Sequence, residues 1–141
     1  MNLTITQRVV IETPFYHIDP IKMAEYKTYL AAVRKDVLLN HKEAYFASHA
    51  LYTEETNDAN PDERTIGIEA GLLWLEVAHK SVVYIDYGFS NGMKHGVKRA
   101  ISLGKPIEFR SLHRKLTQEE QAQFLTQALG AHTTDKEGHI L

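Results

Sequence analysis

The sequence contains no cysteine among its 141 residues. This absence excludes disulfide bonds, thiolate zinc sites and cysteine nucleophiles together. The lack of disulfides does not by itself define the compartment, and a reducing cytosol is its simplest interpretation.

Long hydrophobic runs are also missing. Residues 1–7 are mostly polar and lack the apolar core of a signal peptide, and no run approaches the roughly 18 residues that cross a bilayer. We therefore expect a cytoplasmic protein with no membrane partner.

Charge of one sign is not in excess. Sixteen basic and eighteen acidic residues give a formal net charge of -2, so a broad attraction to nucleic acid is not expected. The eight histidines are scattered, and no pair has the HxxxH spacing that places two imidazoles on one helical face. The sequence therefore predicts neither a nucleic-acid partner nor a metal site.

What is present is the composition of an ordinary globular domain. Hydrophobic residues make up 43% of the chain and charged residues 24%, which is typical of folded proteins. The length fits one domain. We expect residues 1–130 to form that domain and residues 131–141 to be a C-terminal tail.

Strand and helix patterns alternate along the chain. Apolar, β-branched or aromatic runs predict strands at residues 8–15, 44–48, 81–87 and 106–110. Capping residues and helical periodicity predict helices at residues 19–40, 60–77, 90–103 and 117–129. This order predicts an α/β fold: a single-domain, three-layer sandwich with a mainly parallel, Rossmann- or flavodoxin-like sheet.

The second predicted helix has a conspicuous apolar side. Its residues recur at helical spacing on that side. They are Ile66, Ala70, Leu73, Trp74 and Val77.

Ligands of open parallel sheets bind at the carboxyl ends of the strands, and residues 86–93 lie at such an end. Asp86 ends a predicted strand and Ser90 begins a predicted helix, whose free amides could bind a phosphate or carboxylate. The alternative is an ordinary strand–turn–helix with a serine cap. Neither a GxGxxG fingerprint nor a P-loop is present, so we expect no dinucleotide cofactor and no ATP hydrolysis.

Glu12 is unusual because it follows the apolar residues of the first predicted strand. A carboxylate is costly to bury unless it is paired or hydrogen-bonded. Glu12 is therefore either a base, nucleophile or sugar-hydroxyl ligand with a tuned pKa, or a structural carboxylate bonded to loop amides.

Four further residues are weaker candidates. His49 follows the second predicted strand and is either a ligand or a structural hydrogen-bonding group. Arg64 and Arg110 could hold an anion or form surface ion pairs. Glu69 lies between Gly67 and Gly71 in the second predicted helix, and such glycines suggest close packing or the approach of a ligand.

The order of four motifs resembles a known family. They are TPF at 13–15, PDER at 61–64, DYGFSNGM at 86–93 and GKPIEFR at 104–110. The chain is similar, over residues 8–112, to the nucleoside 2-deoxyribosyltransferase-like superfamily, and especially to a small phage- and prophage-associated branch of unassigned function. In that superfamily a glutamate one helical turn after the serine–glycine turn attacks the anomeric carbon. The corresponding residue here is Gly96.

The resemblance implies a nucleoside or nucleotide as partner, no cofactor, a homo-oligomer, and a host-cytoplasmic location if the protein is phage-encoded. Either Glu12 or Glu69 replaces the missing glutamate in an N-glycosidic-bond hydrolase or deoxyribosyltransferase, or the chemistry is lost. In the second case the protein captures a nucleotide-derived signal of host defence, or binds a host protein beside a vestigial pocket. The expected ligand-binding residues are Thr13, Phe15, Tyr16, His49, Asp86, Ser90, Asn91, Gly92, Met93 and Arg110.

Overall fold

A computed structural model of the chain describes residues 3–47, 52, 55–57 and 59–130. His49 and the expected tail at residues 131–141 lie outside these residues. Each helix of the described ranges is too short or too polar to span a lipid bilayer.

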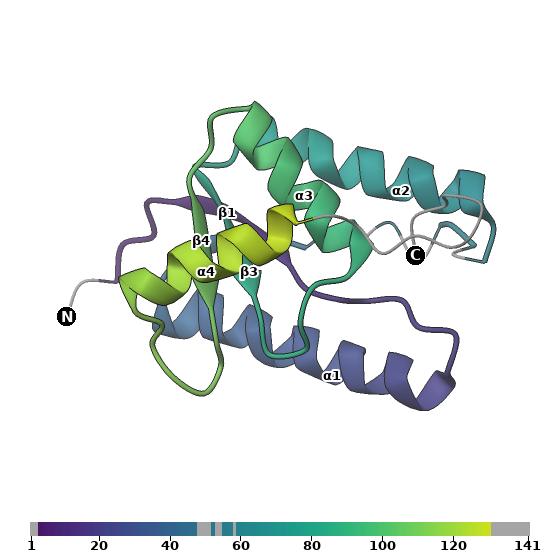
Figure 1. The fold of residues 1–141 in the computed structure, drawn as a ribbon, viewed down its shortest axis with the longest axis horizontal. Helices are drawn as coiled ribbons and strands as arrows, with labels where there is room; N and C mark the ends of the chain where they lie inside the picture. The colour runs from purple at the N-terminus through teal and green to yellow at the C-terminus, as the bar shows by residue number, and fades with distance from the viewer. Residues whose placement is uncertain (1–2, 48–51, 53–54, 58, 131–141) are drawn as a thin grey trace.

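The centre of the fold is a four-stranded sheet (Figure 1). Its strands are β1 (Arg8–Glu12), β2 (Ala44–Phe46), β3 (Lys80–Tyr84) and β4 (Ile107–Arg110). They lie in the order β2-β1-β3-β4, and every neighbouring pair is parallel. The predicted α/β class with a parallel sheet is confirmed.

The first strand is shorter than its apolar run predicts. The run reaches Phe15, but β1 ends at Glu12, two residues before Pro14. Proline has no backbone N–H to donate to the ladder. Glu12 pairs in register with Val83 of β3, so it is the last β1 residue in the sheet.

Helices cover both faces of the sheet. Along one face runs α1 (Pro20–Lys35), which continues into a π-helical turn at Asp36–Asn40. On the other face lie α2 (Pro61–Leu73), α3 (Asn91–Ser102) and α4 (Gln118–Leu129). The result is the predicted three-layer sandwich.

The helices begin where their capping residues predict. Asp19, Asn60, Ser90 and Thr117 each have extended backbone angles and accept a hydrogen bond from an amide of the following first turn. Such caps satisfy the backbone donors that have no partner within the helix.

The apolar side of α2 that the sequence shows is largely exposed. Ile66 is 65% exposed and Leu73 is 62% exposed, whereas Leu72 and Leu75 are buried. The helix is apolar on two sides, and its packing against Val10 and Ala100 buries the side that carries Leu72.

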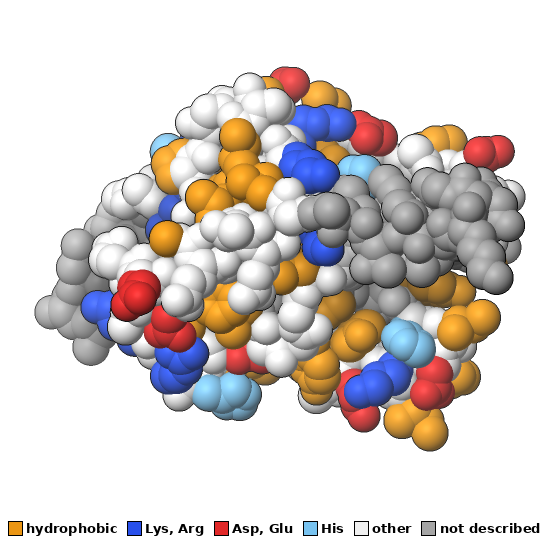
Figure 2. Space-filling view, viewed as in Figure 1, with side chains coloured by type: hydrophobic (Ala, Val, Ile, Leu, Met, Phe, Trp, Pro, Cys, Tyr) orange, Lys and Arg blue, Asp and Glu red, His pale blue; other side chains and the backbone are white. Residues whose placement is uncertain are grey.

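Figure 2 shows one face of the surface. Acidic and basic side chains are interspersed there with hydrophobic ones, and neither sign forms a broad patch. This matches the nearly balanced composition.

Candidate functional site

A cavity lies at the carboxyl end of β1, where an open parallel sheet places its ligands. Figure 1 shows the chain leaving β1 between α1 and α3. The cavity walls come from β1 and its following loop, from α2 and from the start of α3. The lining residues are Glu12, Thr13, Phe15, Tyr16, Tyr52, Thr56, Arg64, Gly67, Ile68, Leu72, Ser90, Gly92 and Met93.

Most of the candidate residues from β1 and the start of α3 come together here. The cavity includes Glu12, Thr13, Phe15, Tyr16, Ser90, Gly92 and Met93. The candidates that do not line it are Glu69, Asp86, Asn91 and Arg110.

Glu12 is the buried ionisable group of the cavity. It is 7% exposed, and within the described part of the chain its carboxyl group has no hydrogen bond or ion pair. Burial raises the pKa of Glu12 from 4.5 to about 8, because the interior disfavours the charged form. At neutral pH the group is therefore mainly a carboxylic acid, which can donate a proton or a hydrogen bond.

The Glu12 carboxyl group extends from β1 to the backbone of α3. A Cβ atom added at Gly96 would lie 2.8 Å from Glu12 Oε2. The carboxyl group therefore sits directly against the α3 backbone at Gly96.

Aromatic and cationic side chains form another part of the cavity. The Arg64 guanidinium lies 5.2 Å from the centre of the Tyr16 ring, within the range of a cation–π interaction. The Tyr52 hydroxyl accepts a hydrogen bond from Trp74 Nε1 at 2.8 Å. Phe15 adds a further aromatic ring to the lining. These flat groups provide surfaces against which a planar ligand could stack.

Four of the lining residues are not among the candidates that the sequence predicts. They are Tyr52, Thr56, Ile68 and Leu72. The glycine at 67 was the available signal, because a helical glycine permits a ligand to approach the backbone.

The first turn of α3 supplies backbone amides to the cavity edge. Ser90 Oγ accepts from the Met93 amide at 3.3 Å, which orients the turn. No hydrogen bond within the described ranges uses the amides of Asn91 or Gly92. Amides at such a position, together with the helix dipole, favour an anionic group.

Asp86 makes contacts on the opposite side of the sheet. It accepts hydrogen bonds from the Tyr29 hydroxyl at 2.6 Å, the Ser111 hydroxyl at 2.5 Å and the Leu112 amide at 3.0 Å. Burial alone would raise the pKa of Asp86, but these hydrogen bonds outweigh it and the pKa is lowered. Asp86 therefore ties the end of β3 to α1 and to the end of β4.

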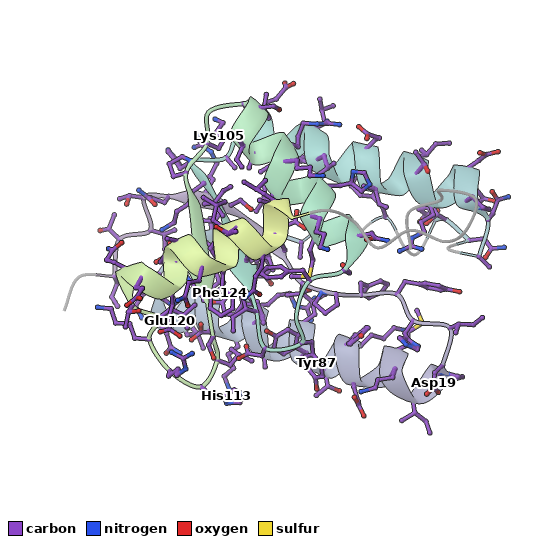
Figure 3. The ribbon with its side chains drawn as sticks, viewed as in Figure 1. Asp19, Tyr87, Lys105, His113, Glu120 and Phe124 are labelled. Atoms are coloured by element: carbon purple, nitrogen blue, oxygen red, sulfur yellow. The ribbon has the colours of Figure 1, made fainter. Side chains whose placement is uncertain are left out.

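A second, open hollow adjoins Asp86 on the α1 side. Tyr87, labelled in Figure 3, packs edge-on against Tyr26 and Tyr29 of α1 at the rim of this hollow. Of the ligand-binding residues that the sequence predicts and the structure describes, only Asp86 lines this hollow.

Arg110 belongs to a buried ion cluster. Its guanidinium binds both carboxylate oxygens of Glu43, at 2.7 and 2.9 Å, and also contacts Glu108. Lys80 joins the cluster through Glu43 at 2.9 Å. These contacts couple β4 to the segment before β2.

Glu69 lies on the exposed surface of α2. Its side chain is 54% exposed and pairs with Arg99 of α3 at 2.9 Å. Glu69 is therefore paired and solvated, and it does not line the cavity that contains Glu12.

The described residues include no group of three histidine, aspartate or glutamate side chains that could hold a metal ion.

Comparisons with known proteins agree with the fold. Residues 7–110 match the model of a family described as "Domain of unknown function (DUF7768)". No curated protein matches the sequence. Among solved structures, the chain is similar to a 2-deoxyribosyltransferase from the psychrotolerant bacterium Bacillus psychrosaccharolyticus, with a TM-score of 0.58 and 18% identity. The superposition covers 91% of this chain and 86% of that one, and at this identity it establishes the fold alone.

Proposed function

The chain belongs to the family described as "Domain of unknown function (DUF7768)", and on that premise we propose that its cavity binds a nucleoside or nucleotide. The observation that carries the proposal is the buried Glu12 carboxyl group, unpaired among the described residues, inside a cavity with aromatic walls. The similarity of the fold to a 2-deoxyribosyltransferase supports the choice of ligand class.

The lining suggests how such a ligand would be held. The base stacks on an aromatic ring of Phe15, Tyr16 or Tyr52. The sugar lies next to Glu12. A phosphate, where present, is directed to the amides at the start of α3 or to Arg64, both of which favour negative charge.

The proposed chemistry is cleavage or transfer of the N-glycosidic bond. Glu12 donates its proton to the leaving nitrogen of the base, and the bond from the anomeric carbon to that nitrogen breaks with its electron pair going to the base. Water, or the nitrogen of a second base, then forms a bond to the anomeric carbon, and the Glu12 carboxylate takes up the proton that this nucleophile releases, which restores the acid.

The test uses the full chain with a panel of nucleosides and nucleoside monophosphates. Calorimetry measures binding, and chromatography measures release of free base. Glu12→Gln keeps the shape of the side chain and removes its acid, so binding should persist while turnover falls by several orders of magnitude. Glu69→Gln is the matched control and should retain both. Absence of binding across the panel would contradict the proposal.

The second candidate is capture of a nucleotide-type ligand without turnover. It is favoured by the lack of a carboxylate on α3 at Gly96, where the resemblance places the attacking glutamate. In this case the wild type binds the ligand intact, no base is released, and Glu12→Gln changes only the affinity.

The proposal includes self-association, which the resemblance implies. Its support is the exposed apolar side of α2, where Ile66 and Leu73 are each more than half exposed, together with the exposed Val77 that follows the helix. Sedimentation of the wild type should show a species larger than the monomer, and Leu73→Lys should shift it toward the monomer. A purely monomeric wild type at high concentration would contradict this part.

A further inference from the structure

Gly96 lies in the interior of α3 and is buried. Among the described glycines, Gly88 and Gly104 have positive φ angles, whereas Gly96 does not. Backbone conformation therefore does not require a glycine at 96, and glycine is among the least favourable residues inside a helix. The reason for glycine at this position must lie in its surroundings.

The surroundings are the carboxyl group of Glu12. A Cβ atom added at Gly96 would lie 2.5 Å from Glu12 Cδ and 2.8 Å from Oε2, and closer still to Oε1. Non-bonded heavy atoms are comfortable at about 3.5 to 4.0 Å. By contrast, a Cβ atom at Gly67, inside α2, would meet Thr56 at an ordinary 3.6 Å.

We infer that Gly96 is a positioning residue, whose missing side chain admits the Glu12 carboxyl group to its place in the cavity. A side chain at position 96 and the carboxyl group of Glu12 exclude each other. What this positioning means for a bound ligand rests on the proposed function. The test of the positioning itself needs no ligand.

The same volume is within reach of a carboxyl group attached to α3. Two successive carbon–carbon bonds of about 1.5 Å at an ordinary angle span about 2.5 Å. This is the separation of Cβ from Cδ within a glutamate, and it equals the distance from the added Cβ at 96 to Glu12 Cδ. The volume therefore takes one carboxyl group, which either residue 12 or residue 96 could supply.

A thermal-unfolding cycle at about pH 4, where Glu12 is mainly protonated in both the folded and the unfolded protein, tests the exclusion. Gly96→Ala should lower the Tm of the wild type, because the new methyl group displaces a buried carboxyl group. In a Glu12→Ala background the same change should raise the Tm, because the space is vacant and alanine is the better helix former. An equal change of the same sign in both backgrounds would overturn the inference.

A control and a fallback make this cycle decisive. Gly67→Ala should raise the Tm in both backgrounds, since its Cβ meets only ordinary contacts. If Gly96→Ala does not fold, the inference requires that Glu12→Ala/Gly96→Ala folds. Failure of that double variant as well would overturn it.

Carboxyl-carbon NMR follows Glu12 directly. Its titration midpoint should lie near 8 in the wild type and move toward the ordinary range in Gly96→Ala, where the group is driven from its place. An unchanged midpoint would contradict a positioning role.

Exchange of the two side chains tests the shared volume. Glu12→Ala/Gly96→Glu should fold, and its new carboxyl group should titrate with a raised midpoint like that of Glu12. An ordinary midpoint, or failure to fold, would overturn the claim that either residue can supply the group. None of these experiments measures the binding or cleavage of a nucleoside. Failure of the inference about Gly96 can therefore be distinguished from failure of the proposed function.

Discussion

Two carboxyl groups at the ends of neighbouring strands have opposite environments. Asp86, just beyond β3, accepts three hydrogen bonds on the α1 side of the sheet, and its pKa is lowered. Glu12, at the end of β1, lies on the other side without a partner among the described residues, and its pKa is raised to about 8. Both acids lie at the carboxyl end of a strand, so this location does not decide whether the oxygens of an acid are bonded. The elements that pack around the acid decide it.

The physical difference arises from what the adjoining helices present. On one side, α1 offers the Tyr29 hydroxyl to Asp86. On the other, the groups around Glu12 include Leu72, Met93 and the bare backbone of Gly96. A buried carboxyl group without donors keeps its proton, which suits it to proton transfer but makes its burial costly once it ionises.

The largest expected effect is on the pH dependence of stability. Unfolded Glu12 loses its proton near pH 4.5, whereas the folded protein retains it up to about pH 8. The unfolded state thus binds fewer protons in this window, and stability falls with rising pH by roughly 1.4 kcal/mol per unit. Glu12→Gln should remove this decline, as urea unfolding between pH 4.5 and 8.5 would show.

This pH window separates Glu12 from the other shifted carboxyl groups. The pKa values of these groups are all lowered, so their contributions to stability change at more acidic pH; they are Asp36, Glu43, Asp86, Glu108 and Glu120. Parallel pH profiles for the wild type and Glu12→Gln would show that Glu12 is not the unpaired group described here.

A smaller but substantial effect is expected at Asp86. Asp86→Asn puts an amide donor where the hydroxyls of Tyr29 and Ser111 already donate, and should cost about 2 to 3 kcal/mol at pH 7. Because the pKa of Asp86 is lowered, its stabilisation is present above pH 3.8 and is lost as the pH falls through the folded-state value. The deficit of the variant should therefore shrink in acid.

Tyr29→Phe is the control for Asp86. It removes the hydroxyl that donates to the Asp86 carboxylate and accepts from the Asp86 amide, and it leaves two donors to that carboxylate, so the loss should be about 1 to 2 kcal/mol. If Asp86→Asn unfolded at the same urea concentration as the wild type, Asp86 would not be the structural tie that its contacts indicate.

The smallest effect is expected at Glu69. Its ion pair with Arg99 is exposed at both ends, and such pairs contribute about 0 to 1 kcal/mol. Glu69→Gln should leave the urea midpoint within about 0.5 kcal/mol of the wild type at every pH. A loss of stability as large as that of Asp86→Asn would contradict the view that the Glu69–Arg99 ion pair is a weak surface contact.

Much of the architecture could be predicted from local sequence. Asp19, Asn60, Ser90 and Thr117 mark helix starts because a capping side chain bonds amides only two or three residues away. The apolar run before Glu12 predicts a buried strand for an equally local reason. The cavity edge formed by Thr13, Phe15 and Tyr16 follows from the rule for parallel sheets.

The side of α2 that faces the sheet could not be predicted in this way. Ile66 and Leu73 share a helical face as good as that of Ile68 and Leu72, so periodicity alone does not choose between them. Packing against β1 and α3 makes the choice, and with it brings Gly67 and Ile68 to the cavity.

Near neighbours along the chain set the order of strands and helices, their capped starts and the presence of an acid at the end of β1. Packing between distant elements sets the rest: Asp86 and Arg110 are bonded by distant side chains, while Glu12 has no partner among the described residues and lies against Gly96. The reason is that an acid's partners are set by which elements pack around it. Neither spacing nor composition encodes the contact between a strand end and a helix backbone far along the chain.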